Sequence, residues 1–471
     1  MIDVDRAVRD GFFDPKILAD EDLYHEEQEK IFRRTWLYVG HESQVAKPGD
    51  FLINYMGEEE VVLLRDPKGV VRVFKNWCPH RGNKVCLFDR GNARAFTCTF
   101  HGWTFDLNGK LIGLGAGREV YGDLEQEMRK GKVLPEVPKV SSYNGLIFAS
   151  WDRDICSLDD YLGDIRPYLD VVTTRPWSGG VEVLPGRARW FFPTNWKAIA
   201  ENWITDDYHV WTTHSSFFRV AKALGPVSPL VTSFVNPDWA VRHTVNVLVT
   251  APAGAPHGLG AVSVWGDHRP GTEYHHEFVL NAGRHLAETL GREAVEWYDD
   301  SVKRITEYFG REGTAKFCSM GNMTVFPNLS LEFLAMVLGG VSLIQWHPRG
   351  ATMHEGWEWV LVDKNAPDPV KRFGQRLVGL GQSPGGMIMI DDSENFERSR
   401  DNLRAALSYK DSMEAIPLSV EAPGNPSYLQ EFEKAGIDLR KAFPAGKVLP
   451  GAQEESGRAF YNYWKDLMMR P

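Results

Sequence analysis

Two short stretches decide how this sequence is interpreted: Cys78-Pro79-His80-Arg81-Gly82 and Cys98-Thr99-Phe100-His101-Gly102-Trp103. Each places one thiol and one imidazole on a predicted tight loop that follows a strand. Two such loops can close on one metal centre from opposite sides, with Cys78, His80, Cys98 and His101 as ligands. Thiolate suits soft or borderline metals, and imidazole suits zinc or iron. The set therefore admits a structural zinc ion, or a [2Fe–2S] cluster with two Cys on one iron and two His on the other.

The order of the ligands favours the cluster. Zinc sites commonly group like ligands, as in a Cys pair followed by a His pair. Here each loop carries one of each kind, which lets both loops reach both irons of a binuclear centre. Imidazole in place of thiolate also makes a cluster less negative and raises its reduction potential. We therefore favour the cluster and keep zinc as the alternative.

The sequence around these loops has the pattern of short strands and turns that is typical of a small β domain. Short β-type runs at 51–55, 61–64, 70–74, 95–99 and 145–151 are separated by turn residues. The turn Leu107-Asn108-Gly109-Lys110 predicts a hairpin, because Asn-Gly tolerates the positive φ angles of a type I′ turn. We expect an all-β domain over residues 40–155.

The remaining residues, 1–39 and 156–471, predict a larger mixed domain, which makes the whole chain α+β. Expected helices lie at 14–37, 196–210, 286–309, 366–380, 390–408 and in an amphipathic tail with Phe460, Trp464 and Leu467 on one side. Expected strands lie at 241–250, 274–280, 324–347 and 354–363.

Composition narrows the class of protein further. The chain has 471 residues, of which 43% are hydrophobic and 25% charged, as in ordinary folded proteins. No apolar run approaches the ~18–20 residues of a membrane helix. The N-terminus does not resemble a signal peptide. Five cysteines are few for a chain of this length, and an odd number does not suit a disulfide framework. We therefore expect a cytoplasmic protein with reduced thiols.

Charge argues against one class of partner and hints at another. A net charge of −10 disfavours nucleic-acid binding. Residues 71–110, however, hold seven Lys or Arg against two acids, a net charge of +5. This stretch is either a chance cluster on a solvated surface or a docking patch for an acidic partner.

A second metal centre is suggested by His209 and His214 together with a distant acidic segment. On an ideal helix these two His would lie about 140° apart, so the helix must end or bulge between them, and Trp211-Thr212-Thr213 is the suitable place. Two His and one carboxylate are the ligands of non-haem iron oxygenases. The segment Asp391-Asp392-Ser393-Glu394 can supply the carboxylate, although acids at a helix start also occur simply as caps.

These motifs resemble those of one enzyme family. The Cys-His loops resemble the Rieske signature. The order Glu-Asn-x3-Asp-x-Tyr-His-x4-His, followed by Asp-Asp-x-Glu-Asn, resembles the large (alpha) subunit of Rieske non-haem iron aromatic-ring-hydroxylating oxygenases. The resemblance extends to about residue 400 and implies a larger domain in which helices surround an antiparallel sheet. It implies a Rieske [2Fe–2S] cluster on the four residues named above, and one mononuclear Fe(II) bound by His209, His214 and Asp392, with Asp391 as the alternative carboxylate.

The resemblance also assigns two supporting residues and an assembly. Asn202 would lie near the iron. Asp206, three residues before His209 and able to hydrogen-bond with it, would link that ligand to His101 of the partner subunit. This arrangement implies a homotrimer, with or without a small beta subunit (α3β3).

The function implied is that of a terminal oxygenase. It would use O2 and electrons from NADH, passed on by a reductase, a ferredoxin or both, for cis-dihydroxylation of an aromatic hydrocarbon. No Arg adjoins the iron ligands His209, His214 and Asp392, which favours a neutral substrate over an aromatic acid. The alternatives are a monooxygenase or demethylase of the same family acting on an aromatic acid, and a Rieske electron carrier without oxygenase activity.

Overall fold

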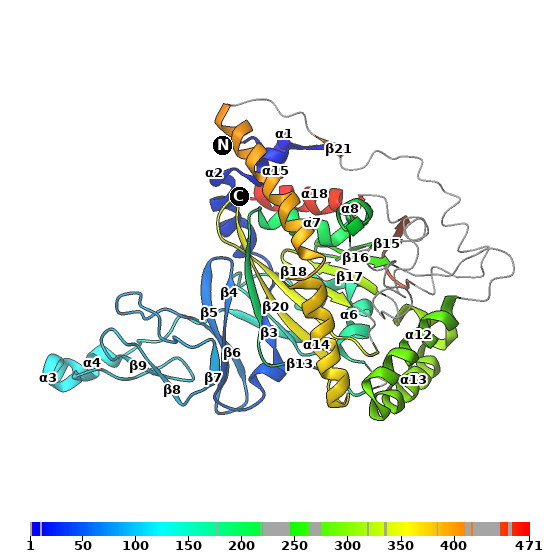
Figure 1. Ribbon diagram of the computed structural model, residues 1–471. Helices are drawn as coiled ribbons and strands as arrows, with labels where there is room; N and C mark the ends of the chain where they lie inside the picture. The colour runs from blue at the N-terminus through cyan, green and yellow to red at the C-terminus, as the bar shows by residue number, and fades with distance from the viewer. Residues whose placement is uncertain are drawn as a thin grey trace. The chain divides into compact units, whose positions relative to one another are not determined.

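Two units divide the chain in the computed structural model, Gln28–Leu158 and, together, Met1–Glu27 and Asp159–Pro471 (Figure 1). The structure describes residues 2–9, 12–175, 178–216, 219, 245–262, 275–317, 320–333, 337–383, 385–409, 416–417, 443–450 and 455–471. The sequence assigns residues 28–39 to the larger domain, whereas in the structure they belong to the smaller unit. The reason is that strand β3 (Leu37–His41) pairs with β12 (Leu146–Ser150).

The smaller unit is built from three small sheets, ordered β6-β5-β4-β7, β10-β9-β8 and β11-β12-β3. Its other strands are β4 (Asp50–Met56), β5 (Glu59–Arg65), β6 (Val71–Lys75), β7 (Arg90–Asn92), β8 (Ala95–Thr97), β9 (Thr104–Asp106), β10 (Leu111–Gly113) and β11 (Lys139–Tyr143). Its short helices include α3 (Gly117–Tyr121) and α4 (Glu125–Arg129). The expected β-rich domain is confirmed in architecture.

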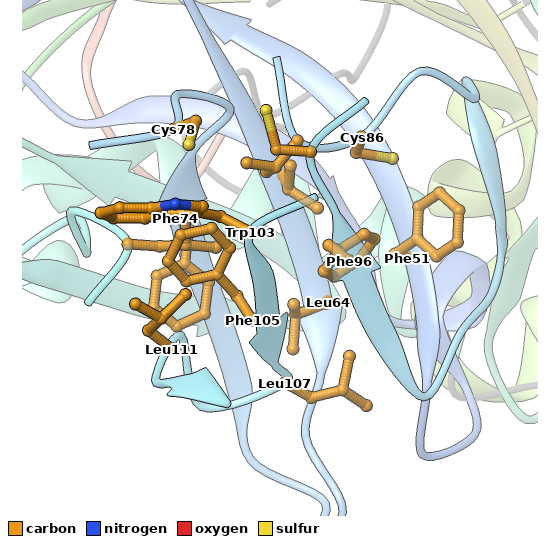
Figure 2. Close-up of a cluster of buried hydrophobic side chains, with 14 of the residues drawn as sticks. Phe51, Leu64, Phe74, Cys78, Cys86, Phe96, Trp103, Phe105, Leu107 and Leu111 are labelled. Atoms are coloured by element: carbon orange, nitrogen blue, oxygen red, sulfur yellow. The ribbon is translucent and has the colours of Figure 1, made fainter. Parts of the chain in front are cut away.

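One core joins the strands of the smaller unit to the two Cys-His loops (Figure 2). Phe51 and Phe96 meet edge to face at 5.3 Å, and Phe105 is fully buried. Cys78 and Trp103 belong to the same cluster of buried side chains and lie at one end of it. The loops are therefore anchored in the core through their own residues.

The predicted hairpin forms between β9 and β10, but its turn differs from the expected type. Gly109 has a positive φ of 77°, whereas Asn108 does not. The Asp106 carboxylate accepts the backbone N–H groups of Asn108 and Lys110, both at 2.9 Å, and so fixes the turn from the preceding strand. Side-chain capping by Asp106 replaces the type I′ geometry that the Asn-Gly pair predicts.

The larger unit is organised around a nine-stranded sheet in which the neighbouring pairs are antiparallel. The order is β13-β20-β19-β18-β17-β16-β15-β22, with β14 also paired to β20. These strands are β13 (Val181–Val183), β14 (Ala188–Phe192), β15 (Val245–Thr250), β16 (Pro256–Val262), β17 (Met320–Val325), β18 (Leu329–Phe333), β19 (Val341–Pro348), β20 (His354–Asp363) and β22 (Lys447–Pro450).

Helices complete the larger unit and confirm the α+β class. They are α1 (Val4–Ala7), α2 (Glu21–Glu27), α5 (Leu158–Leu162), α6 (Arg166–Thr173), α7 (Trp196–Thr205), α8 (Asp207–Thr213), α12 (His275–Leu290), α13 (Arg292–Phe317), α14 (Asp368–Gln382), α15 (Met389–Tyr409) and α18 (Glu455–Met469). The short strands β1 (Val8–Arg9), β2 (Phe12–Phe13) and β21 (Ile416–Pro417) form a separate small sheet. None of the helices in the described part of the chain is both long and apolar enough to cross a bilayer.

Helices α7 and α14 lie on the same face of the nine-stranded sheet. The Trp203 ring of α7 packs 5.6 Å from that of Trp346 on β19. On α14, a Cβ at Gly374 would meet the backbone N of Gly340 at 2.7 Å, beside the Val360 side chain of β20. Val360 pairs with Ser342, two residues from Ile344 and four from Trp346, so these side chains share one face. Figure 1 shows α14 and α15 crossing this part of the sheet.

Three local predictions differ from the structure. Residues 275–280 begin helix α12 rather than forming a strand, because α12 packs on α13, with Tyr298 donating to the Leu280 carbonyl at 2.9 Å. The helix expected over 286–309 is interrupted at Gly291, whose φ is +108°. The N-terminal helix ends in a π-helical turn at Gln28–Phe32, before Trp36.

The other long elements agree with expectation. Helices α14, α15 and α18 and strand β20 lie where the pattern predicts them. The expected strand at 241–250 is present from Val245, and residues 241–244 lie outside the described residues.

Candidate metal centres

The two Cys-His loops of the smaller unit have the same construction. In the first, Cys78 N donates to Asn83 O at 2.7 Å and Gly82 N to Cys78 O at 2.8 Å; in the second, Cys98 N donates to Trp103 O at 2.8 Å and Gly102 N to Cys98 O at 2.9 Å. Each loop thus turns through a glycine with positive φ, +78° at Gly82 and +67° at Gly102. Similar backbones present the two Cys-His pairs in similar ways.

The loops bring all four predicted ligands together. The His80 and His101 rings lie 4.5 Å apart between centroids, and His80 stacks on Trp103 at 4.6 Å. Cys78 and Cys98 are 1% and 2% exposed and are close enough to hydrogen-bond. Both His are less buried than the thiols. The thiols therefore lie on the inner side of the site and the imidazoles on the outer side.

The surroundings of the sulfur atoms favour thiolate ligands. Backbone N–H groups of His80 and Arg81 point at Cys78, and those of Phe100 and His101 at Cys98. Burial raises the pKa of Cys98, but the Phe100 N–H and the Asn83 amide, 3.6 Å from the sulfur, outweigh burial and lower that pKa. Burial raises the pKa of Cys78. Such N–H donors also stabilise the negative charge of a cluster sulfur.

These residues fit a [2Fe–2S] cluster. The buried Nδ1 atom of His80 has no hydrogen-bond partner among the described residues, so its lone pair is open to a metal. The pairing of two inner thiols with two outer imidazoles matches a centre whose two irons have different ligands. Phe100, 59% exposed, covers His101 from outside with a ring separation of 4.0 Å.

A second group of ligands comes together in the larger unit from α8, the residue after it, and α15. One donor atom from each of His209, His214 and Asp392 lies within 4.8 Å of the others. Asp392 Oδ1 is 3.5 Å from His209 Nε2 and 3.4 Å from His214 Nε2. Metal–ligand bonds of about 2.0–2.2 Å separate adjacent ligand atoms by roughly 3–3.5 Å. The three side chains therefore fit a single divalent metal ion.

The end of α8 explains how both imidazoles reach one point. Helix α8 ends at Thr213, and His214 is its C-cap, with φ −95° and ψ 22°. The predicted helix end between the two His is thus confirmed. The sequence did not predict the break between α7 and α8, where Asp206 is at once the C-cap of α7 and the N-cap of α8.

Asp206 holds His209 through its capping position. Its Oδ1 accepts the His209 backbone N–H at 3.0 Å, and its Oδ2 lies 3.4 Å from His209 Nδ1. The Asp206 backbone carbonyl also contacts Nδ1. Asn202, one turn earlier on α7, lies 3.5 Å from Asp206 Oδ2 and 3.3 Å from His209 Nδ1. The carboxylate and the carbonyl of Asp206 are acceptors, so they favour a proton on Nδ1 and leave Nε2 to face the metal site. The Asn202 amide is a donor and bonds to the Asp206 carboxylate.

Burial and charge set the protonation of the three ligands. Burial, with the nearby His209, lowers the pKa of His214 to about 3, and the neutral imidazole that results is the metal-binding form. Burial lowers the pKa of His209 too, but the hydrogen bond and charge of Asp206, aided by the charge of Asp392, raise it to about 9. Burial raises the pKa of Asp392 to about 7. A cation would relieve the buried charge of this carboxylate.

Asp391 lies on the other side of His214. Its Oδ2 is 3.5 Å from His214 Nδ1 and accepts from Ser216 Oγ at 3.4 Å. Because His214 Nε2 faces Asp392, Asp391 contacts the nitrogen that points away from the candidate site. This position suits a residue that orients an imidazole ligand.

A buried ion pair stabilises the start of α7, and the sequence does not predict it. Glu27 and Lys197 have fully buried side chains and are paired. The Glu27 carboxylate also accepts the indole N–H groups of Trp196 and Trp464, each at 2.8 Å. One carboxylate thus joins α2, the start of α7 and α18. The local sequence around Glu27, at the end of α2, gives no sign of this role. Only the two indole N–H groups that it accepts indicate it.

The comparisons with known proteins agree with the two sites. Residues 35–122 match the family model of the Rieske [2Fe-2S] domain, and residues 158–470 match that of the ring hydroxylating alpha subunit (catalytic domain). The chain is 33% identical over 462 residues to chlorobenzene dioxygenase subunit alpha of Cupriavidus sp. (strain PS12), covering 98% of this chain and 92% of the relative. It is 32% identical over 467 residues to biphenyl 2,3-dioxygenase subunit alpha of Rhodococcus jostii (strain RHA1), covering 98% and 90%.

A solved structure gives the same result. Naphthalene 1,2-dioxygenase with indole bound in its active site superposes with a TM-score of 0.77 at 27% identity, over 98% of this chain and 93% of that one. Both family models together span nearly the whole chain, in the order of the two units. The chain therefore belongs to the family of ring-hydroxylating oxygenase alpha subunits, oxidoreductases that combine a Rieske [2Fe–2S] cluster with mononuclear non-haem iron.

Proposed function

We propose that this chain is the terminal oxygenase component of an NADH-dependent dioxygenase that converts an aromatic hydrocarbon ring to a cis-dihydrodiol. The observation that carries the proposal is the convergence of His209, His214 and Asp392 within 4.8 Å in a chain that also holds two Cys-His loops. When bound, the mononuclear iron supplies the reductive activation of O2. The relatives named as chlorobenzene and biphenyl dioxygenases support a substrate of this chemical class.

In this proposal each residue has a defined role at the iron site. His209 and His214 bind through Nε2 and Asp392 through its carboxylate, which leaves other coordination positions for O2. Asp392 is favoured over Asp391 because its Oδ1 lies within 3.5 Å of both Nε2 atoms. Asp206 and Asn202 hold the Nδ1 side of His209. The acceptor oxygens of Asp206 keep the ring proton on Nδ1, and the Asn202 amide orients the Asp206 carboxylate.

The four residues Cys78, His80, Cys98 and His101 hold the cluster, which stores one electron for the reaction. The proposed cluster domain is the smaller unit, Gln28–Leu158, and the proposed iron domain is the larger unit, Met1–Glu27 with Asp159–Pro471. Asp206, on the outer nitrogen of the ligand His209, is placed to accept a hydrogen bond from a second imidazole. In the proposed trimer that imidazole is His101 of the partner subunit, which gives the electron a short path between the centres.

The partners follow from the reaction. Electrons come from NADH through a reductase, a ferredoxin or both, as this family of terminal oxygenases requires. The relatives are named as alpha subunits, which supports a small beta subunit and an α3β3 assembly. Dependence on NADH, together with the reduced thiols of the cluster loops, favours work in the cytoplasm.

Iron analysis with matched variants tests the site assignments. The intact protein should contain about three iron atoms per chain, two from the cluster and one more. Asp392→Ala should lose about one of them and all product, while the reduced cluster keeps its EPR signal. Asp391→Ala, the comparison variant, removes a carboxylate that only orients His214, so it should lose less iron than Asp392→Ala. Equal iron in both variants, or loss in Asp391→Ala alone, would contradict the assignment.

Product analysis tests the reaction itself. Reconstitution with a reductase and 18O2 should place both labelled oxygen atoms in one diol. A single labelled oxygen would identify a monooxygenase or demethylase of the same family. Electron transfer with no oxygen in any product would identify an electron carrier and reject the proposal.

A further inference from the structure

Three buried polar residues lie on the sheet face that α7 and α14 cover. Glu332 of β18 is paired directly with Ser342 of β19, so the two side chains share this face. Ser342 donates to Glu358 Oε1 on β20 at 2.5 Å. The two glutamates are 7% and 3% exposed. A carboxyl pair in the interior of a sheet is unusual, since Glu is seldom buried without a partner.

Gln382, the last residue of α14, covers Glu332 and is 1% exposed. Its side-chain amide hydrogen-bonds with the Glu332 carboxyl group. Two buried atoms remain without a hydrogen-bond partner among the described residues, Glu332 Oε2 and Gln382 Oε1. Glu358 differs from them because Ser342 satisfies it. The two unsatisfied atoms come from different elements and belong to side chains in contact with each other.

The same pair adjoins the iron ligands. After Gln382 the chain turns sharply, and Met387 N and Ile388 N donate back to the carbonyls of Leu380 and Gly381 at 2.8 and 3.3 Å. This turn brings Ile388, four residues before Asp392, back to the last turn of α14. The charge of Asp392 also reaches Glu332 and contributes to its raised pKa. Gln382 and Glu332 therefore lie near the carboxylate ligand, close enough for the charge of Asp392 to act on Glu332.

An unsatisfied buried polar atom has a cost. Leaving a buried acceptor without a hydrogen bond costs about 1–3 kcal/mol. The cost is recovered when a ligand brings a donor to the site, and such sites discriminate strongly against analogues that lack the donor. Burial, with the charges of Glu358 and Asp392, raises the pKa of Glu332 to about 8, so this carboxyl is largely neutral at pH 7. A neutral donor suits it, and a carboxylate substituent beside Asp392 does not.

We propose that Glu332 and Gln382 recognise a hydrogen-bond-donating substituent on the aromatic ring, so that the preferred substrate is an aryl amine or a phenol rather than an unsubstituted hydrocarbon. This inference rests on the proposed function and changes its substrate from an aromatic hydrocarbon to an arene that carries such a substituent. Gln382 Oε1 accepts from the amino or hydroxyl group. Glu332 Oε2 accepts from the group or donates to it. Both residues determine specificity and bind no metal.

The experiment compares aniline with toluene, in which a methyl group of similar size replaces the amino group. Binding is measured by calorimetry on the isolated oxygenase, and kcat/KM by O2 uptake and product with a reconstituted reductase. The double variant Glu332→Leu, Gln382→Leu removes both acceptors and leaves no new unpaired partner. Glu358→Gln is the matched control, because it changes a neighbouring carboxyl that already has a partner.

The result expected is a change in preference. The aniline-to-toluene ratio of affinities should fall about 10–100-fold in the double variant relative to the original chain, the equivalent of one or two lost hydrogen bonds. It should be unchanged in Glu358→Gln. The ratio cancels the general preference of apolar sites for toluene. Single variants Glu332→Gln and Gln382→Leu serve if the double variant does not fold, each with a smaller fall in the same direction.

Other outcomes separate this inference from the proposed function. An unchanged ratio with toluene converted to a diol would refute the inference and leave the function standing; buried water on the two atoms would explain it. A fall of equal size in Glu358→Gln would show a general effect of polarity and would also refute it. Failure of both arenes, and of phenol and benzene, to bind or to stimulate O2 uptake would reject the proposed function itself.

Discussion

Removing the Glu27 carboxylate should weaken the larger unit at the point where α7 begins. Glu27 accepts from Trp196 and Trp464 and pairs with the buried Lys197. The substitution Glu27→Leu keeps a side chain of similar size and removes all three interactions. Lys197 then keeps only the weaker opposing charge of Asp20.

The magnitude follows from these contacts. An uncompensated buried charge costs about 3–5 kcal/mol. Lys197 can avoid part of that cost by losing its proton, because burial already lowers its pKa against the opposing effect of Glu27. Deprotonating an ordinary lysine at pH 7 costs about 5 kcal/mol, and this value is the upper limit for the cost of the unpaired charge. The two indole N–H groups add about 1–3 kcal/mol each. Together these contributions give a cost of about 5–11 kcal/mol for Glu27→Leu, comparable to the whole stability of a typical domain.

The assay is urea unfolding followed by circular dichroism, with iron content as a second readout. Glu27→Leu with Lys197→Met removes the charge as well as its partner, so the double variant should recover about 3–5 kcal/mol of the loss. Glu27→Gln keeps one acceptor oxygen, so its free energy of unfolding should lie between those of Glu27→Leu and the double variant. Because α7 carries Asn202 and leads to His209, the single variant should also retain less mononuclear iron. A cost below about 2 kcal/mol, or a double variant no more stable than Glu27→Leu, would refute the reasoning.

Three further predictions concern the rest of the chain. The Asp66 carboxylate accepts hydrogen bonds from Lys68 N, Val70 N and Arg72 Nε at 2.8, 2.9 and 3.0 Å, and although burial raises the pKa of Asp66, these donors outweigh burial and lower it. Asp66→Asn should therefore reduce the free energy of unfolding by about 1–3 kcal/mol at pH 7. Thermal unfolding at several pH values should show this difference shrinking as the pH falls below about 4. Burial raises the pKa of Glu332 to about 8, so the free energy of unfolding should decline as the pH rises from about 4.5 to 8. In the double variant Glu332→Leu, Gln382→Leu the free energy of unfolding should depend less on pH over this range. The same pH dependence in both proteins would contradict the buried carboxyl group. Gly82→Ala should lose the visible absorbance of the cluster, because φ is +78° and the new Cβ would meet Trp77 Nε1 at 2.6 Å; Gly69→Ala, with φ +84° and open space, is the control for backbone strain alone and should keep it.

The Cys-His loops could be predicted from the sequence because their information is local. Ligands two and three residues apart on a turn must lie close together whatever the rest of the fold does. The end of α8 before His214 was predictable for the same reason, since geometry forbids two His five residues apart from sharing one helix face. The meeting of these His with Asp392 depended on resemblance alone.

Other features depended on tertiary contacts that no local pattern carries. Asp206 was expected on a helix face and instead ends one helix and begins the next. Residues 275–280 have a β-type pattern, and packing against α13 makes them helical. Glu332 lies in Leu-Ser-Leu-Glu-Phe, where alternation suggests an exposed acid, yet both faces of the sheet are covered there. Only the assembled sheet reveals it as buried.

The way the chain passes through its two units has a consequence for biosynthesis. Gln28–Leu158 is one continuous segment, whereas the other unit needs segments from before and after it in the sequence: Trp464 bonds to Glu27, and β22 forms the last strand of the large sheet. A continuous segment can fold while the ribosome is still translating, but the surrounding unit must wait for the final helix to emerge. The nascent chain thus carries a finished cluster-binding module alongside an open, aggregation-prone remainder. Synthesis of α18, rather than iron loading, should set the earliest moment at which the larger unit can close.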